Sequence, residues 1–298
     1  MESPESTRLG FGCAAIPGAL TQREALTLLE TAYACGIRHF DTARMYCAGT
    51  SEAVLGELAR RLGTELIIVT KAGIAPTSRF TRALDKFGLA PRFLKHLGGR
   101  FAPAQIVASL ETSLRKLRVD RVDALLLHEV RIDEIDDELK ITLERLRAAG
   151  KIGAWGIATS IAESEAIIAA HPELCDIVQV PAAWLDHPRS IPPHAKLIVH
   201  SVLGPRLAAF ITTLRGSERS ARQFEKETGL SVDDPTAIGG LMLQAAMARN
   251  PGGVTLFSTS RPERVRLNAE LLTADPDSAA IHCLERAMRP PDALRAVK

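Results

Sequence analysis

The segment HFDTARMYCAGTSE, residues 39–52, holds an acid, a base and a phenol within six positions, at Asp41, Arg44 and Tyr46. The apolar run IRHF (37–40) leads into it, and SEAVLGELARRLG, which ends on a glycine, overlaps its end and continues beyond it. A short apolar run is typical of a buried strand, and the longer run is typical of a helix that stops at its glycine. The segment is therefore predicted to connect the strand and the helix of one β-α unit.

The same order of strand and helix repeats along the chain. Short segments rich in branched apolar side chains alternate with longer segments of helical spacing. Capping boxes of the form S/T-x-x-E mark helix starts at Thr21, Ser160 and Ser260. Repeated β-α units predict parallel strands, and about eight of them in this length predict one (β/α)8 barrel domain over residues 1–298. The expected strands are 7–12, 37–40, 65–70, 122–128, 151–159, 175–180, 195–204 and 253–259.

Composition excludes several classes of protein. Hydrophobic residues make up 46% and charged residues 24% of the chain, as in ordinary globular proteins. The formal charge of +2 and the lack of long basic runs argue against nucleic acid as a partner. No apolar run reaches the roughly 20 residues of a membrane helix, so no membrane association is expected. The five cysteines show neither zinc nor disulfide spacing, which predicts reduced thiols, no metal site and a cytoplasmic location.

Titratable side chains terminate three successive expected strands. Asp41 follows the second strand, Lys71 follows the third and His128 closes the fourth, while Tyr46 lies in the loop after the second. In a (β/α)8 barrel the reacting groups come from the carboxyl ends of the strands. Each residue alone has an ordinary structural explanation, such as a helix cap or a buried histidine. Four of them at one rim predict a catalytic site.

These four side chains suit one reaction. A phenol has a pKa near 10 and is a poor acid at neutral pH. The Lys71 ammonium is expected to lower the pKa of Tyr46, and Asp41 to keep Lys71 charged and in place. His128 can orient a carbonyl oxygen by a hydrogen bond. The set predicts a general acid that protonates a developing alkoxide, as carbonyl reduction by hydride transfer requires.

At these residues the chain resembles the aldo-keto reductases, over nearly its whole length. The pattern Asp-Thr-Ala-x-x-Tyr, followed by Gly-x-Ser-Glu, carries the resemblance together with LGFGCAAIPG, LIIVTKAG, VDALLLHEV, LERLRAAGKIGAWGIATS and LFSTSRPERVRLN. The resemblance implies a nicotinamide-dependent oxidoreductase that interconverts an aldehyde or ketone and its alcohol. It implies Tyr46 as proton donor, Asp41 and Lys71 as the groups that tune it, and His128 as the group that orients the substrate. The spacing around AGTSE is similar to the aldose and galactose dehydrogenase branches, so a sugar is a candidate substrate.

The resemblance also implies the cofactor NADP(H), with NAD(H) as the alternative, bound without a separate dinucleotide domain. Gln179 matches the glutamine that holds the nicotinamide carboxamide, and His200 takes the place of the ring that stacks on nicotinamide. Gly12 would let the first strand pass close to the cofactor. The usual Ser-Asn pair after the fifth strand is here Ala158 and Thr159. The segment that binds the adenosine phosphate corresponds to Ser258, Thr259, Arg264 and Asn268, with serine where a lysine is common.

A dinucleotide-binding fingerprint is also present in the sequence, but the helix that such a fingerprint requires is not expected there. GFGCAA (10–15) fits the fingerprint G-x-G-x-x-G/A. The fingerprint requires a helix that begins inside the motif, whereas Pro17 and Gly18 interrupt the segment and the capped helix is expected only near Thr21. The match is interpreted as chance.

Two other functions are compatible with the same residues. The departures at Ala158, Thr159, His200 and Ser258 allow a lyase or dehydratase that works without a cofactor on the same barrel. A regulatory subunit that binds the cofactor without turnover is the other alternative. The expected partner is a small-molecule carbonyl or alcohol, with no obligate protein partner evident. Substrate specificity is expected to lie in the long connections 73–103 and 201–235.

Overall fold

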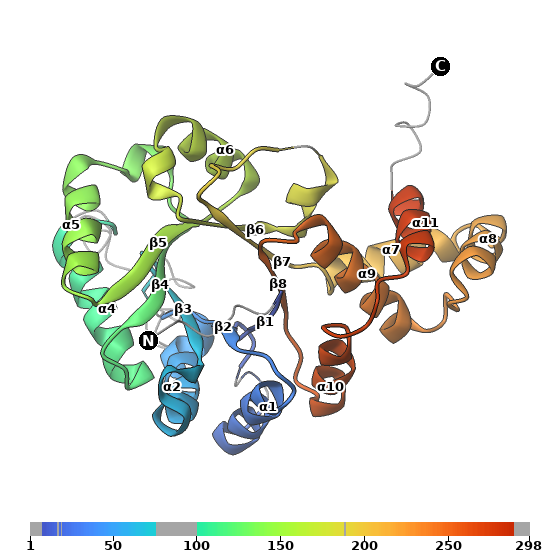
Figure 1. The fold of residues 1–298 in the computed structure, drawn as a ribbon, viewed down its shortest axis with the longest axis horizontal. Helices are drawn as coiled ribbons and strands as arrows, with labels where there is room; N and C mark the ends of the chain where they lie inside the picture. Colours follow the sequence, from blue (N-terminus) through green and yellow to red (C-terminus); the bar gives the residue numbers. More distant parts are fainter. Residues whose placement is uncertain (1–7, 17, 19, 76–99, 188, 289–298) are drawn as a thin grey trace, which may run out of the picture.

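Eight parallel strands close into a barrel in the computed structural model, which describes residues 8–16, 18, 20–75, 100–187 and 189–288. Each strand pairs with the next along the chain, and the last pairs with the first (Figure 1). The (β/α)8 prediction is confirmed. The strands are β1 (Leu9–Gly12), β2 (His39–Asp41), β3 (Ile67–Ala72), β4 (Val122–His128), β5 (Ile152–Ala158), β6 (Ile177–Pro181), β7 (Lys196–His200) and β8 (Val254–Phe257).

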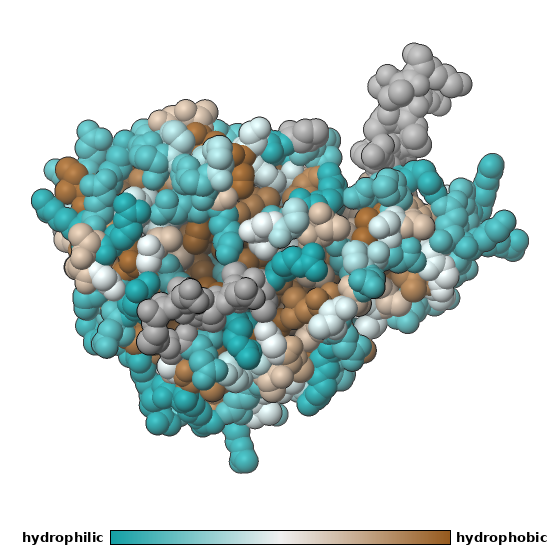
Figure 2. All heavy atoms as spheres, in the orientation of Figure 1, coloured by the Kyte–Doolittle hydropathy of each residue, from teal (hydrophilic) through white to brown (hydrophobic). Residues whose placement is uncertain are grey.

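Helices surround the barrel and bury one face against it (Figure 1). In α2 (Thr50–Leu62), the buried Val54, Leu55 and Leu58 recur at helical spacing. Hydrophilic side chains cover most of the outer surface of the face drawn in Figure 2. Within the described ranges, no helix is long and apolar enough to cross a bilayer. The other helices are α1 (Gln22–Ala34), α4 (Pro103–Leu117), α5 (Asp137–Ala148), α6 (Ile161–Ala170), α7 (Pro205–Arg215), α8 (Glu218–Thr228), α9 (Pro235–Arg249), α10 (Pro262–Glu270) and α11 (Ser278–Met288).

One of the three predicted capping boxes forms completely and the third does not form, while at Ser160 only half of the box is present because the Glu163 carboxylate accepts from the Ile132 amide instead. Thr21 and Ser160 each accept a hydrogen bond from the backbone amide of the glutamate three residues later. The capping box predicted at Ser260 is wrong, because α10 begins at Pro262 with Arg261 as its N-cap and without a side-chain cap. Proline is favoured at the first helical position, and it moves the helix start one residue beyond the place that a serine cap requires.

The connections predicted to set specificity are only partly described. Residues 76–99 of the first connection lie outside the described part of the chain. The second connection, 201–235, begins with a short loop after β7 and continues as α7 and α8. The dinucleotide fingerprint at 10–15 runs from β1 into a turn, and α1 starts only at Gln22. The chance interpretation of that motif is therefore confirmed.

Small and branched apolar side chains fill the interior of the barrel below its carboxyl-end rim. Alternate residues of each strand point inward, as parallel strands of a barrel require. Titratable groups replace the apolar ones toward the carboxyl ends. The interior apolar cluster consists of Val69, Ala124, Leu126, Ala158, Ile177, Ile198, Val254 and Leu256.

His39, on β2, is a polar exception inside this cluster. A Cβ added at Gly10 would lie 2.8 Å from the His39 ring and from Leu256, so the glycine makes room for the imidazole. His39 is buried, and neither ring nitrogen has a hydrogen-bond partner among the described residues. Burial lowers the pKa of His39 to about 4, so the ring is neutral at physiological pH.

This histidine should make the fold sensitive to acid. An unfolded chain takes up the His39 proton near pH 6.5, whereas the folded protein does so only near pH 4. The free energy of unfolding should therefore fall as the pH drops through this window, by about 2 kcal/mol at about pH 5. In His39→Leu the fall between about pH 7.5 and about pH 5, measured by urea unfolding, should be smaller by that amount. His282→Leu, at an exposed site on α11, serves as the control and should behave as the wild type. An equal pH dependence in His39→Leu and the wild type would contradict the assignment.

Candidate active site

The carboxyl ends of β2, β3 and β4 bring the four predicted catalytic residues together. Asp41 is the last residue of β2, and His128 is the last residue of β4. Lys71 lies one residue before the end of β3, which runs slightly further than predicted. Tyr46 begins the short 3-10 turn η1 (Tyr46–Gly49) after β2. All four line one cavity of about 390 Å³ at the rim of the barrel.

A buried ion pair forms the floor of this cavity. The Lys71 ammonium lies 2.5 Å from Oδ1 of Asp41 and donates a second hydrogen bond to the Thr42 carbonyl at 3.0 Å. Gln179 donates from Nε2 to the other oxygen of Asp41 at 2.8 Å. Lys71 and Asp41 are 2% and 3% exposed. Burial alone would lower the pKa of Lys71, but the Asp41 charge, aided by Tyr46, outweighs it and raises the pKa, so the lysine stays charged.

Tyr46 lies between Lys71 and His128. The Lys71 ammonium is 4.9 Å from the centre of the phenol ring, and the His128 ring stands perpendicular to it at 5.9 Å between centroids. Burial raises the pKa of Tyr46 above its ordinary value, even though Lys71 acts in the opposite direction. The predicted net lowering of this pKa is therefore wrong. The physical reason is that burial disfavours the phenolate, while Asp41 offsets part of the field of the lysine.

Two histidines face the cavity in their neutral forms. Burial, aided by the charge of Lys71, lowers the pKa of His128 to about 4. Burial also lowers the pKa of His200, whose Nδ1 lies 2.8 Å from the Ser201 hydroxyl. A neutral imidazole has one donor and one acceptor nitrogen, so His128 can donate to a carbonyl oxygen at neutral pH.

The turn that carries Tyr46 is fixed by buried polar contacts that the sequence did not reveal. The hydroxyl of Ser51 donates to the Cys13 carbonyl at 3.0 Å and lies 2.9 Å from the Thr42 hydroxyl. Glu52 is fully buried and accepts a hydrogen bond from Thr70 at 2.8 Å. Ser51 and Glu52 thus tie the start of α2 to the ends of β1, β2 and β3. In the sequence they are the last two residues of the Gly-x-Ser-Glu pattern, which does not by itself show that they are buried.

Left-handed backbone also shapes this turn. Cys47, Ala48 and Gly49 adopt φ of 47°, 56° and 84° in succession. A Cβ at Gly49 would lie 2.2 Å from Nζ of Lys116, which donates to the Gly49 carbonyl at 3.0 Å. The positive φ of the glycine in the Gly-x-Ser-Glu pattern favours glycine at this position, and the space above its Cα is occupied by the end of the Lys116 side chain.

The predicted cofactor residues divide into two groups. Gly12, Gln179, His200 and Ser258 line the cavity with the four catalytic candidates. Thr259, Arg264 and Asn268 do not line it, although they lie directly after β8 or on α10. The cavity also has walls that were not named individually, and five of them, residues 201–205, belong to the connection 201–235 that was expected to set specificity. These are Ala14, Glu129, Ser201, Val202, Leu203, Gly204, Pro205, Leu256 and Phe257.

The polar groups of the cavity fit the amide end of a nicotinamide. Because Nε2 of Gln179 donates to Asp41, Oε1 is the atom left to accept a hydrogen bond from a carboxamide, and no described residue donates to it. Ala158 supplies no hydrogen-bonding side chain at the rim, whereas Thr159, which carries a hydroxyl, lines the same cavity. Outside the cavity, Arg264 is exposed on α10 and has no carboxylate partner among the described residues. The described residues hold no cluster of three or more acids, histidines or cysteines that suits a metal ion.

Comparisons with known proteins point to one family. The model of the aldo/keto reductase family matches residues 8–196. D-threo-aldose 1-dehydrogenase from Pseudomonas sp is 34% identical over 168 residues, which cover 52% of this chain and 51% of that protein. The NADH-specific methylglyoxal reductase of Escherichia coli (strain K12) is 29% identical over 193 residues, covering 60% of this chain and 56% of that protein.

The solved structures show the same fold. An aldo-keto reductase from Klebsiella pneumoniae in complex with NADPH superposes with a TM-score of 0.66 at 20% identity, covering 96% of this chain and 92% of that chain. This chain spans about half the length of the curated relatives that it matches. The match to the family model extends over more than half of the chain and includes Asp41, Tyr46, Lys71 and His128. The chain belongs to the aldo/keto reductase family.

Proposed function

We propose that the protein is an oxidoreductase that interconverts an aldehyde or ketone and its alcohol, with Tyr46 as general acid and base. NADP(H) is the proposed cofactor, with NAD(H) as the alternative. The observation that carries the proposal is the position of the Tyr46 phenol between Lys71 and His128, above a buried lysine–aspartate pair, in a cavity at the barrel rim. Reductases and dehydrogenases among the family relatives support it.

Residues at two places of the protein would hold the cofactor. Gly12, Gln179, His200 and Ser258 would contact its nicotinamide end, because they line the cavity beside the catalytic candidates. Arg264 would hold the adenosine phosphate at the N-terminal turn of α10. When bound, the cofactor supplies the hydride that reduces the carbonyl carbon.

The proton chemistry belongs to the protein. Because burial raises the pKa of Tyr46, the phenol stays protonated at neutral pH. Its Oη can therefore donate a proton to the carbonyl oxygen of the substrate as negative charge develops on that oxygen. Neutral His128 donates an N–H hydrogen bond that orients the same oxygen. The Lys71 ammonium stabilises the phenolate that remains, and Asp41 holds the ammonium in place. Alcohol oxidation uses the same groups in reverse.

The cavity walls favour a hydroxylated substrate. Glu129, Thr159 and Ser201, whose side chains carry a carboxylate and two hydroxyls, line the cavity with the catalytic residues. Several acceptors in one small cavity suit the hydroxyl groups of a sugar, and one relative is a D-threo-aldose 1-dehydrogenase. A small sugar or polyol with a carbonyl group is therefore part of the proposal.

The remaining features of the proposal concern the whole chain. One domain over residues 1–298 is supported by a barrel whose strands run from Leu9 to Phe257. A cytoplasmic location is supported by five unpaired cysteines, which suit a reducing compartment.

The cofactor-free lyase is distinguished from the oxidoreductase by titration of the protein with NADPH and NADH, because the lyase would bind neither. The regulatory subunit is distinguished by the absence of turnover with model aldehydes.

Removing the phenol oxygen should abolish most of the activity. We expect Tyr46→Phe to lower kcat for carbonyl reduction by at least about 100-fold, since general acid catalysis typically contributes roughly 100- to 10,000-fold. The cofactor dissociation constant should stay nearly unchanged, because the phenol acts on the substrate oxygen. Steady-state kinetics with an aldehyde and fluorescence titration with NADPH measure both. Near-normal turnover in this variant would show that another group is the acid.

The ion pair should matter separately for stability and for catalysis. Asp41→Asn leaves the buried Lys71 charge without its partner, and we expect a loss of about 3–5 kcal/mol in the free energy of unfolding. The double variant Asp41→Asn/Lys71→Met should recover more than half of that loss. It should nevertheless remain nearly inactive, because no ammonium is left to stabilise the phenolate. Urea unfolding and steady-state kinetics on the three proteins test this. Equal stability of Asp41→Asn and the wild type would refute the role of the pair.

Cofactor choice should depend on one arginine. A hydrogen-bonded contact to a charged group contributes roughly 1.5–3 kcal/mol, so Arg264 should favour NADPH over NADH by about 10- to 100-fold. Arg264→Ala should erase most of this preference while barely changing the affinity for NADH. Arg266→Ala, at another exposed arginine of α10, is the matched control and should keep the preference. If the wild type binds both cofactors equally, Arg264 is an ordinary surface residue.

A further inference from the structure

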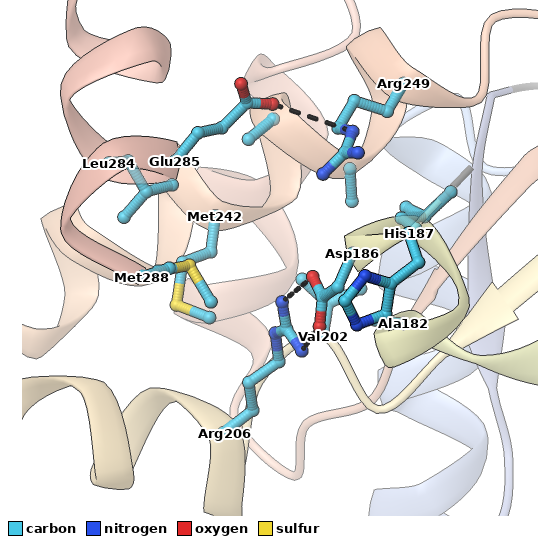
Figure 3. Close-up of a pocket in the computed structure, with 13 residues that line it drawn as sticks. Ala182, Asp186, His187, Val202, Arg206, Met242, Arg249, Leu284, Glu285 and Met288 are labelled. Atoms are coloured by element: carbon cyan, nitrogen blue, oxygen red, sulfur yellow. Dashed lines mark hydrogen bonds and ion pairs between the residues drawn. The ribbon is translucent and has the colours of Figure 1, made fainter. Parts of the chain in front are cut away.

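A second cavity, of about 530 Å³, lies outside the barrel (Figure 3). It is bounded by the 3-10 segment η6 (Ala182–Asp186), by the loop after β7 and by helices α7, α9 and α11. Its volume exceeds that of the catalytic cavity and falls in the range of small-molecule sites. None of the catalytic candidates lines it.

The wall of this cavity is mainly apolar. Ala182, Val202, Met242, Ala246 and Leu284 are buried residues that contribute to it. Met242 comes from α9, and Met288, from the last turn of α11, adds a second thioether (Figure 3). Methionine side chains are flexible and polarisable, so they adapt to ligands of different shape.

The charged side chains of the wall are already paired with one another. Arg206 donates two hydrogen bonds to the carboxylate of Asp186, at 2.9 and 2.6 Å. Arg249 lies 3.6 Å from the Glu285 carboxylate. The two cations and two anions cancel, so a charged ligand would either break one pair or lose its own hydration without compensation. The cavity therefore suits an uncharged ligand.

One residue connects this cavity with the catalytic one. Val202 lines both cavities, and its neighbours Ser201 and Leu203 line the catalytic cavity. The loop turns through left-handed backbone at Ser201 (φ 58°) and at Gly204 (φ 65°). Because Val202 lines both cavities, a ligand that displaces it on one side also changes the wall on the other.

We propose that the second cavity binds an uncharged, largely apolar small molecule, and that its occupancy alters ligand affinity in the catalytic cavity through the loop that carries Val202. The coupling rests on the proposed function, because it is measured on cofactor binding. Binding of the small molecule in the second cavity does not rest on the proposed function.

Binding is tested with two fluorescent probes that differ by one charged group. N-phenyl-1-naphthylamine is neutral, and 8-anilinonaphthalene-1-sulfonate carries a sulfonate on the same ring system. The full chain should bind the neutral probe saturably and at least about 10-fold more tightly than the sulfonate. Tighter binding of the sulfonate, or no saturable binding of the neutral probe, would overturn the proposal.

Three variants locate the probe. Ala246→Phe and Met288→Trp fill the second cavity, and each should weaken binding of the neutral probe by about 10-fold or more. Met288 is only partly buried, so its replacement keeps the test valid if Ala246→Phe does not fold by circular dichroism. Ser258→Trp, at an exposed residue, narrows the catalytic cavity instead and should leave probe affinity within about 2-fold. Loss in Ser258→Trp with retention in the other two would place the probe in the catalytic cavity and overturn the proposal.

Coupling is measured by calorimetric titration of NADPH with and without saturating neutral probe. We expect the NADPH dissociation constant to change by about 5-fold or more, and the probe affinity to change by the same factor when NADPH is saturating. An unchanged constant would overturn the coupling. Failure of NADPH to bind at all would reject the proposed cofactor and the coupling that rests on it, while the probe results would still decide whether the second cavity is a binding site.

Discussion

The ion pair between Lys71 and Asp41 is the interaction on which the site depends. Removing two charges from water costs several kcal/mol for each, and a buried pair is tolerable only with good geometry and further hydrogen bonds. Both are present here, because Lys71 also donates to the Thr42 carbonyl and Gln179 donates to Asp41. These partners come from three different strands or strand ends. The bond from Gln179 joins β6 to the end of β2, so the full set of partners of the pair forms only when these distant strands have come together in the barrel.

The register of the barrel strands decides the arrangement above the pair. Asp41 lies opposite Val69, so Lys71 stands one inward-facing position further along β3. Lys71 lies opposite Leu126, and His128 again stands one inward-facing position further along β4. This stagger moves each side chain closer to the open rim and creates room for Tyr46 beside the lysine and the histidine. A shift of one residue in either register would turn the side chains outward and remove the site.

Much of this arrangement could be predicted from the sequence, because it depends on local patterns. Apolar runs in the sequence indicate the strands. If the strands are parallel, a titratable residue at the end of such a run must lie at the carboxyl-end rim of the barrel. The sign of the Tyr46 pKa shift could not be predicted, since it depends on how deeply the phenol is buried and on partial cancellation of Lys71 by Asp41. The roles of Ser51 and Glu52 were also hidden, because polar residues at a helix start usually face solvent. Their burial results from contacts with strands that are distant in sequence.

The rim of the barrel combines a fixed part with an adaptable one. At β2 to β4, buried charges, short hydrogen bonds and a turn of left-handed backbone hold the proposed proton donor, so small displacements there are costly. On the other side, the loop after β7 turns through positive φ at Ser201 and Gly204, and the Arg206 to Asp186 contact joins the start of α7 to η6. Val202, in this loop, lines the cavity on each of its two sides. Proton chemistry that needs fixed geometry and recognition that needs adjustment can therefore be provided by opposite sides of the same cavity.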